Sequence, residues 1–138
     1  MFSPRPRRQA VRSTFGAPQK INQEATPEMA LVLSTARPHE LLARIRTAID
    51  LGYVKTWSYD FDGDFTHTPS QWDRKAWLRP KVTENGLRLA TIRPQGTPIT
   101  WEVYGVYMGR FAEMAIAHFN GFFEAAVSTS QPASDDSV

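Results

Sequence analysis

Cysteine is absent from all 138 residues, which excludes disulfide bonds, thiolate metal sites and cysteine nucleophiles. Long apolar runs are missing too. The most apolar window, residues 103–123, is interrupted by charged and polar side chains and does not predict a membrane span. The N-terminus has arginines but lacks the apolar segment of a secretory signal. We therefore expect a cytoplasmic protein with no membrane partner and no cofactor.

A strong excess of one charge is also lacking outside the N-terminal stretch. The net charge is +2 and the pI is 9.2, but residues 1–28 hold five Lys or Arg against two Glu. Residues 29–127 hold eleven Lys or Arg against ten Asp or Glu. The high pI is therefore no evidence of nucleic-acid binding by itself.

The two ends of the chain contain few large apolar residues. Residues 1–28 are basic and proline-containing, and residues 128–138 consist largely of small and polar residues. Neither end can bury enough apolar surface to offset the entropy lost on ordering, which predicts two disordered tails. Residues 29–127 remain as a single domain, small but long enough to fold without disulfide bonds.

Helical periodicity predicts one helix near each end of this domain. The first spans residues 38–51, with Pro38 in the first turn and a glycine directly after the end. The second spans residues 100–126, with Thr100 as its N-cap. Residues 30–33 are either an edge strand or a packed lead-in to the first helix.

A Gly-x-x-x-Gly spacing in the second helix, Gly105 and Gly109, permits the close approach of another helix. The chain's own first helix is favoured as that neighbour over a second protomer.

A first hairpin is predicted from residue 54 to residue 68, with Asp62-Gly63 as a two-residue turn. This register places His67 opposite Ser58. It also sends Asp60 and Asp64 to opposite faces, so the three carboxylates of the turn are not expected to converge.

A second hairpin is predicted over residues 76–93, with Asn85-Gly86 as the turn and Glu84 opposite Leu87. One face is core-like: Leu78, Pro80, Val82, Leu87, Leu89 and Thr91. The other face is basic with a few apolar groups: Trp77, Arg79, Lys81, Thr83, Arg88, Ala90 and Ile92.

The acidic turn begins like a calcium loop, because Asp60, Asp62 and Asp64 alternate as carboxylates do in such loops. The glycine and the later carboxylate of that loop are replaced by Phe65 and Gln71. A solvated acidic turn is therefore favoured. A metal-dependent hydrolase using these aspartates and His67 remains an alternative.

His67 also suits a hydrolytic triad, since Ser58 and Asp60 would share its face of the hairpin. One hairpin supplies neither the full triad geometry nor an oxyanion site. A surface or satisfied histidine is therefore the favoured interpretation.

The second hairpin predicts a recognition surface formed by Trp77, Arg79, Lys81 and Arg88. Basic groups beside an aromatic plane bind either an acidic protein or single-stranded nucleic acid. The acidic turn, with Asp60, Asp62 and Asp64, provides a surface of opposite charge. This polarity favours docking on a protein partner or head-to-tail contact in a homodimer.

Two stretches, residues 56–68 (TWSYDFDGDFTHT) and residues 76–80 (AWLRP), resemble a group of small uncharacterised bacterial proteins found on plasmids, phages and other mobile elements. The resemblance extends over about residues 29–123. It implies a bacterial cytoplasmic setting, a compact α/β body and a role in conflict between mobile elements and their hosts. It implies no catalytic residues.

The predicted fold is α+β, with two helices packed on one face of a mainly antiparallel four-stranded sheet. Its order is helix, hairpin, hairpin, helix. The predicted function is that of a non-enzymatic interaction protein. A nucleic-acid-binding protein that uses the basic hairpin and the N-terminal tail is the first alternative, and the metal-dependent hydrolase is the second.

Overall fold

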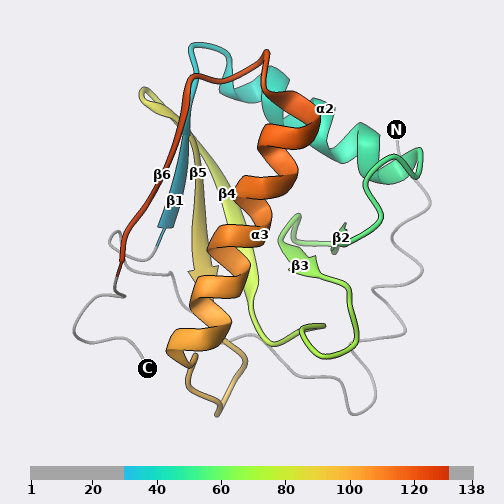
Figure 1. The fold of residues 1–138 in the computed structure, drawn as a ribbon, viewed down its shortest axis with the longest axis vertical. Helices are drawn as coiled ribbons and strands as arrows, with labels where there is room; N and C mark the ends of the chain where they lie inside the picture. Colours follow the sequence, from blue (N-terminus) through green and yellow to red (C-terminus); the bar gives the residue numbers. More distant parts are fainter. Residues whose placement is uncertain (1–29, 131–138) are drawn as a thin grey trace.

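The computed structural model describes residues 30–130 (Figure 1). The elements follow in this order: β1 (Ala30–Ser34), α2 (Pro38–Asp50), β2 (Trp57–Tyr59), β3 (Phe65–His67), β4 (Trp77–Thr83), β5 (Gly86–Ile92), α3 (Trp101–Phe119) and β6 (Ala125–Ser128). The tails predicted over residues 1–28 and 128–138 lie outside this range except for residues 128–130. Ser128 is the last residue of β6.

The six strands form one antiparallel sheet in the order β2-β3-β4-β5-β1-β6. The prediction of four strands is therefore wrong. The two additional strands are β1, which lies between β5 and β6, and β6, which had been assigned to the end of the last helix. That helix ends at Phe119, and Asn120 is its C-cap. Short runs of Ala and Val fit either a helix or a strand, so the pattern alone does not separate the two.

Both helices begin where the sequence predicts. Proline stands at the start of α2, and Glu40 is in the first turn, where negative charge is favourable. Gly52 follows the C-cap with a φ of +84°, which is the left-handed conformation that glycine adopts after many helices. At the start of α3, the hydroxyl of Thr100 accepts a hydrogen bond from the Val103 N–H (3.1 Å). Among the described residues, neither helix is long and apolar enough to cross a membrane.

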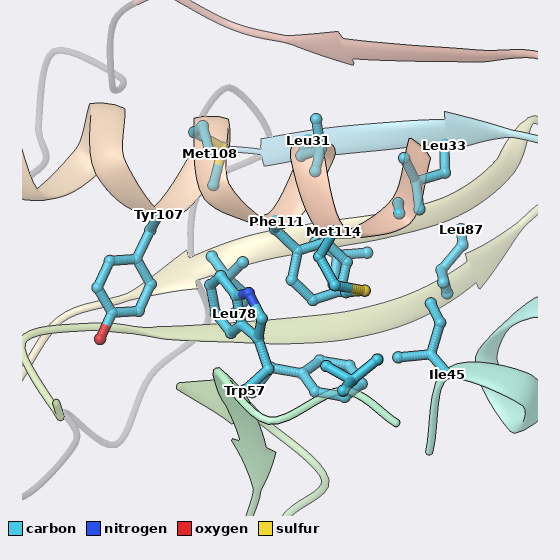
Figure 2. Packing of buried hydrophobic residues seen from close by; sticks show 14 of the residues in the cluster. Leu31, Leu33, Ile45, Trp57, Leu78, Leu87, Tyr107, Met108, Phe111 and Met114 are labelled. Carbon is cyan, nitrogen blue, oxygen red and sulfur yellow. The ribbon is translucent and has the colours of Figure 1, made fainter. Parts of the chain in front are cut away.

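Both helices pack on one face of the sheet, as predicted, and enclose the main core (Figure 2). Leucines of β1 and β5 face Ile45 of α2 and the aromatic residues of α3. Phe111 contacts the Trp57 ring edge-on, with a centroid distance of 4.9 Å. Fully buried side chains of this core include Leu31, Leu33, Leu41, Ile45, Trp57, Phe65, Leu78, Leu87, Leu89, Tyr107 and Phe111. The opposite face of the sheet, which neither of the described helices α2 and α3 covers, is called the helix-free face below.

The β4–β5 hairpin turns one position earlier than predicted. Thr83 pairs with Gly86 and Val82 pairs with Leu87, so the turn residues are Glu84 and Asn85. The pairing thus differs from the predicted register by two residues. Because side chains alternate with a period of two, the predicted content of each face is nevertheless correct.

The β2–β3 hairpin differs from its predicted register by one residue. Trp57 pairs with His67 and Tyr59 pairs with Phe65, which leaves a longer turn. The Gly63 N–H donates to the Asp60 carbonyl (2.8 Å), and Gly63 has a φ of +83°. A reversal that ends in a left-handed glycine is typical of three-residue hairpin loops. The slip moves side chains to the face opposite the predicted one.

The glycine pair of α3 does not serve the contact predicted for it. Among residues 30–130, nothing lies within 4 Å of the position that a Cβ would take at Gly105 or Gly109, apart from the helix's own backbone. The expectation that the first helix packs there is wrong. In the described chain this side of α3 is open.

Candidate functional site

The three aspartates of the β2–β3 turn gather in one place. Asp60, Asp62 and Asp64 each contribute an oxygen, and these oxygens lie within 4.8 Å of one another. The prediction that they do not converge is wrong because the longer turn brings Asp60 opposite Asp64. The backbone N–H of Asp60 donates to the Asp64 carbonyl (3.1 Å).

Asp60 and Asp64 both have structural partners. Asp60 Oδ1 accepts hydrogen bonds from the backbone N–H groups of Asp62 and Asp64, both at 3.0 Å. The fully buried carboxylate of Asp64 accepts two hydrogen bonds from Arg79, Nε to Oδ1 at 3.1 Å and Nη2 to Oδ2 at 2.9 Å. The hydrogen bond with Asp64 raises the pKa of Arg79, against the opposing effect of burial. A planar guanidinium thus supplies positive charge where a metal ion would have to bind.

The predicted basic residues lie on the helix-free face of β4 and β5. Lys81 stands directly opposite Arg88. Lys81 is exposed and Arg88 is partly buried. Trp77 is on the same face, but only 1% of its surface is exposed. The structure therefore brings Arg79, Lys81 and Arg88 together and encloses Trp77.

The acidic and basic surfaces, predicted to lie on separate ribbons, meet at one ion pair. Asp64 of the first hairpin holds Arg79 of the second. Asp60 and Asp62 add to the negative field around the same guanidinium. Lys81 and Arg88, which stand opposite each other in β4 and β5, are called the basic pair below.

A groove of about 640 Å³ lies on the other side of the sheet, along α3. Its walls are the second half of α3, residues 53–56 and the loop at residues 69–72. The side chains that give it chemical character are Lys55, His67, Trp72, Arg110, Glu113 and His118. This surface is called the His67 groove below.

The imidazole of His67 is held in one tautomer. Its Nδ1 lies 2.8 Å from the Thr56 carbonyl, which can only accept, so Nδ1 carries the proton. Its ring also packs against Trp57 with a centroid distance of 4.6 Å. Burial lowers the pKa of His67, with a smaller contribution in the same direction from Arg110, and Thr56 and Glu113 act in the opposite direction. At neutral pH, Nε2 is therefore a hydrogen-bond acceptor.

The triad considered for this histidine does not form. His67 stands opposite Trp57 instead of Ser58. It faces the helices, whereas Asp60 lies beside the helix-free face with Asp64 and Arg79. The interpretation of His67 as a histidine with its hydrogen-bonding groups satisfied is confirmed for Nδ1.

Tyr107 connects α3 to the loop beside the His67 groove. Its hydroxyl donates to the Trp72 carbonyl and accepts a hydrogen bond from the His67 N–H (3.4 Å), and it lies at hydrogen-bond distance from Thr66 Oγ1 (2.9 Å). Burial raises the pKa of Tyr107. The sequence pattern did not predict this role of Tyr107. A tyrosine within the apolar stripe of a helix is the available signal, because a buried phenol requires a polar partner.

A scan of protein-family models and searches of curated proteins and solved structures found no match to this chain.

Proposed function

We propose that the protein is a non-enzymatic interaction protein that docks an acidic segment of a protein partner on the basic pair, Lys81 and Arg88. The observation that supports this proposal is their position directly opposite each other in neighbouring strands. Like charges in that position destabilise a sheet. An anionic partner that binds the exposed ammonium group of Lys81 would relieve the repulsion and gain a charge-assisted hydrogen bond.

The carboxylates beside the basic pair favour a protein over a nucleic acid. Asp60 and Asp62 lie close to Arg79, and Asp64 neutralises that guanidinium. A nucleic acid presents a continuous row of phosphates and needs a long basic track. Here the positive strip is short and ends at a negative cluster, which suits a short acidic peptide.

The cellular setting of this function, a bacterial cytoplasm and a mobile element, stays a prediction of the resemblance. The metal-dependent hydrolase stays an alternative. This alternative predicts a measurable heat of binding when the protein is titrated with Mg²⁺, Mn²⁺, Ca²⁺ or Zn²⁺ in a calorimeter. It also predicts that this heat is lost when Asp60 is replaced by Asn.

Fluorescence anisotropy tests the docking proposal with two labelled probes, a peptide of alternating Asp and Glu and a single-stranded oligothymidylate. We expect the peptide to bind at low salt and the double variant Lys81→Glu/Arg88→Glu to lose that binding at least tenfold. The matched control is Arg44→Glu/Lys75→Glu, which makes the same change in net charge at exposed positions outside the basic pair.

Equal peptide affinity in the two double variants would contradict the proposal, because net charge alone would then explain the binding. The oligonucleotide could instead bind more tightly than the peptide, with a steep dependence on salt and the same sensitivity to Lys81→Glu/Arg88→Glu. That result would identify the ligand as a nucleic acid and not an acidic peptide.

The His67 groove supports a second candidate function, the binding of a small anionic compound. Lys55 and Arg110, which forms an ion pair with Glu113 (3.0 Å), provide positive charge at the groove, and Nε2 of His67 can accept a hydrogen bond from the ligand. A planar carboxylic acid with a hydroxyl group matches both features, and 4-hydroxybenzoate is a suitable probe. Long-range ¹H–¹⁵N NMR should show the Nε2 resonance of His67 shifting on titration, with no shift in Arg110→Gln at the same concentration. An unchanged Nε2 resonance at millimolar probe would remove this candidate.

A further inference from the structure

We infer that a second copy of this chain pairs along the outer edge of β6 and that the protein is a two-fold symmetric dimer. β6 is one of the two outer strands of the sheet (Figure 1). Its inner side pairs with β1, where Val32 faces Val127. The second copy would pair with its other side, and this contact does not depend on the docking of an acidic partner.

The backbone of β6 presents hydrogen-bonding groups outward. The Thr129 N–H donates to the Ala30 carbonyl (3.3 Å), so the backbone N–H of residue 129 points toward β1. In an antiparallel ladder, alternate residues bond to the same side. Val127 therefore also points its N–H and C=O inward. The N–H and C=O groups of Ala126 and Ser128 point away from the sheet and are available to another strand.

The β6 edge lacks the charged residues and the proline that often prevent edge strands from pairing. Its four residues include no charge and no proline, and Val127 is 60% exposed. Protective edge strands are short, charged, bulged or interrupted by proline. The other outer strand, β2, meets this description because it has three residues and leads directly into the acidic turn.

The flank of α3 on the β6 side continues the same surface. At 100° per residue, five positions fall on one flank: Trp101, Gly105, Gly109, Ala112 and Ile116. Arg110 and Glu113 fall on the other flank, toward the His67 groove. β6 and the β2–β3 pair lie on opposite sides of α3 (Figure 1). The Tyr104 hydroxyl also donates to the Thr129 carbonyl (3.1 Å), which places the start of α3 over the end of β6.

This flank is apolar and open. Trp101 is 57% exposed and Ile116 is 54% exposed, and no other part of the described chain approaches Gly105 or Gly109 within 4 Å. Small residues between bulky apolar ones allow two helices to approach closely. The unpaired edge of β6 in the sheet layer and the exposed flank of α3 in the helix layer thus lie on the same side of the described chain.

A second copy can pair with this surface without bringing like charges opposite each other. With the two-fold axis at Val127, Ala126 of each copy pairs with Ser128 of the other, which allows four backbone hydrogen bonds. The two exposed Val127 side chains then meet on the helix-free face. Glu124 of each copy comes opposite Ser130 of the other, so no two glutamates face each other.

Sedimentation velocity over a hundredfold range of concentration tests the inference. We expect a monomer–dimer equilibrium for the full chain and a monomer for two variants. Ala126→Pro removes an outward N–H without removing a hydrogen bond to β1. Ile116→Arg places a charge on the α3 flank and leaves the sheet hydrogen bonds unchanged.

Each variant has a matched control that should remain dimeric. Ala126→Ser keeps the N–H, and Ala117→Arg puts the same charge on the adjacent, exposed residue at the His67 groove. A full chain that sediments as a monomer at every concentration overturns the inference. So does a dimer that persists in Ile116→Arg, even if Ala126→Pro fails to fold.

Discussion

The β2–β3 hairpin and the β4–β5 hairpin both reverse next to a glycine, yet they treat their charges in opposite ways. In the first, a buried aspartate is held by an arginine of the second, at 2.9 Å. In the second, a lysine stands directly opposite an arginine. The first arrangement brings opposite charges into contact, whereas the second places like charges opposite each other. The ion pair belongs to the fold, and the proposed docking would give the like-charged pair a role in binding.

The two turns also differ in how strictly they require glycine. A Cβ at Gly86 would lie 2.2 Å from the Leu33 carbonyl oxygen, and φ is +140°. A Cβ at Gly63 would meet only the end of the Arg46 side chain, at 2.6 Å, with φ at +83°. A side chain at Gly86 would therefore clash with the backbone of β1, which cannot easily move. A side chain at Gly63 would clash only with the Arg46 side chain, which can move.

The largest expected effect comes from this difference. We expect Gly86→Ala to lower the free energy of unfolding by about 3 kcal/mol or more, from backbone strain and the clash with β1. Gly63→Ala should cost about 1–2 kcal/mol, the penalty of a left-handed residue. Urea denaturation of both variants measures this, and equal losses would contradict the close contact at Gly86.

The second effect tests the ion pair that joins the hairpins. Arg79→Met leaves the buried Asp64 without its guanidinium and should destabilise the protein by about 3 kcal/mol. This value is at the low end for buried pairs, because the Arg79 side chain is 38% exposed. The double variant Arg79→Met/Asp64→Leu removes the stranded charge and should recover most of the loss. No recovery in the double variant would show that packing, and not charge, explains the cost.

A smaller, pH-dependent effect belongs to the β2–β3 hairpin alone. Because burial lowers the pKa of His67, the folded state binds fewer protons than the unfolded state in mild acid. Its contribution to stability is complete above the unfolded pKa of about 6.5 and decreases as the pH falls through that value. Unfolding free energies measured from about pH 8 to about pH 5 should therefore fall more steeply in the wild type than in His67→Gln. Parallel curves would contradict this assignment.

The smallest effect should have the opposite sign. Lys81→Glu turns the repulsive cross-strand pair into an attractive one and should raise the free energy of unfolding by about 0.5 kcal/mol. The same variant should weaken the binding of the acidic peptide. A thermal unfolding curve decides the first point. A variant that is less stable than the wild type would mean that the basic pair does not strain the sheet.

The features that depend on alternation or on local signals could be predicted from the sequence. Pro38 and Gly52 mark the ends of α2 correctly to within a residue or two. The two faces of the β4–β5 hairpin are also correct, because its error in register is an even number. Thr100 caps α3 as expected.

The other features depend on contacts between distant residues. Residues 125–128 form a strand because β1 offers an unpaired edge, which no local pattern reveals. The one-residue slip at Asp62-Gly63 depends on whether the turn has two or three residues, and Asp-Gly fits both. That slip decides whether the aspartates gather and where His67 faces. The His67 groove was missed because its walls come from three separate segments.

The adjacency of β1 and β6 has a consequence for how the chain reaches its final form. During synthesis, β1 is among the first described segments to leave the ribosome, and its partner β6 is the last. One side of β1 therefore stays uncovered while the intervening strands and helices emerge. A fragment that stops before Ala125 leaves β1 as an unpaired edge strand, with leucines on one face and Val32 on the other. Completion of the sheet is thus a late event in the life of the nascent polypeptide.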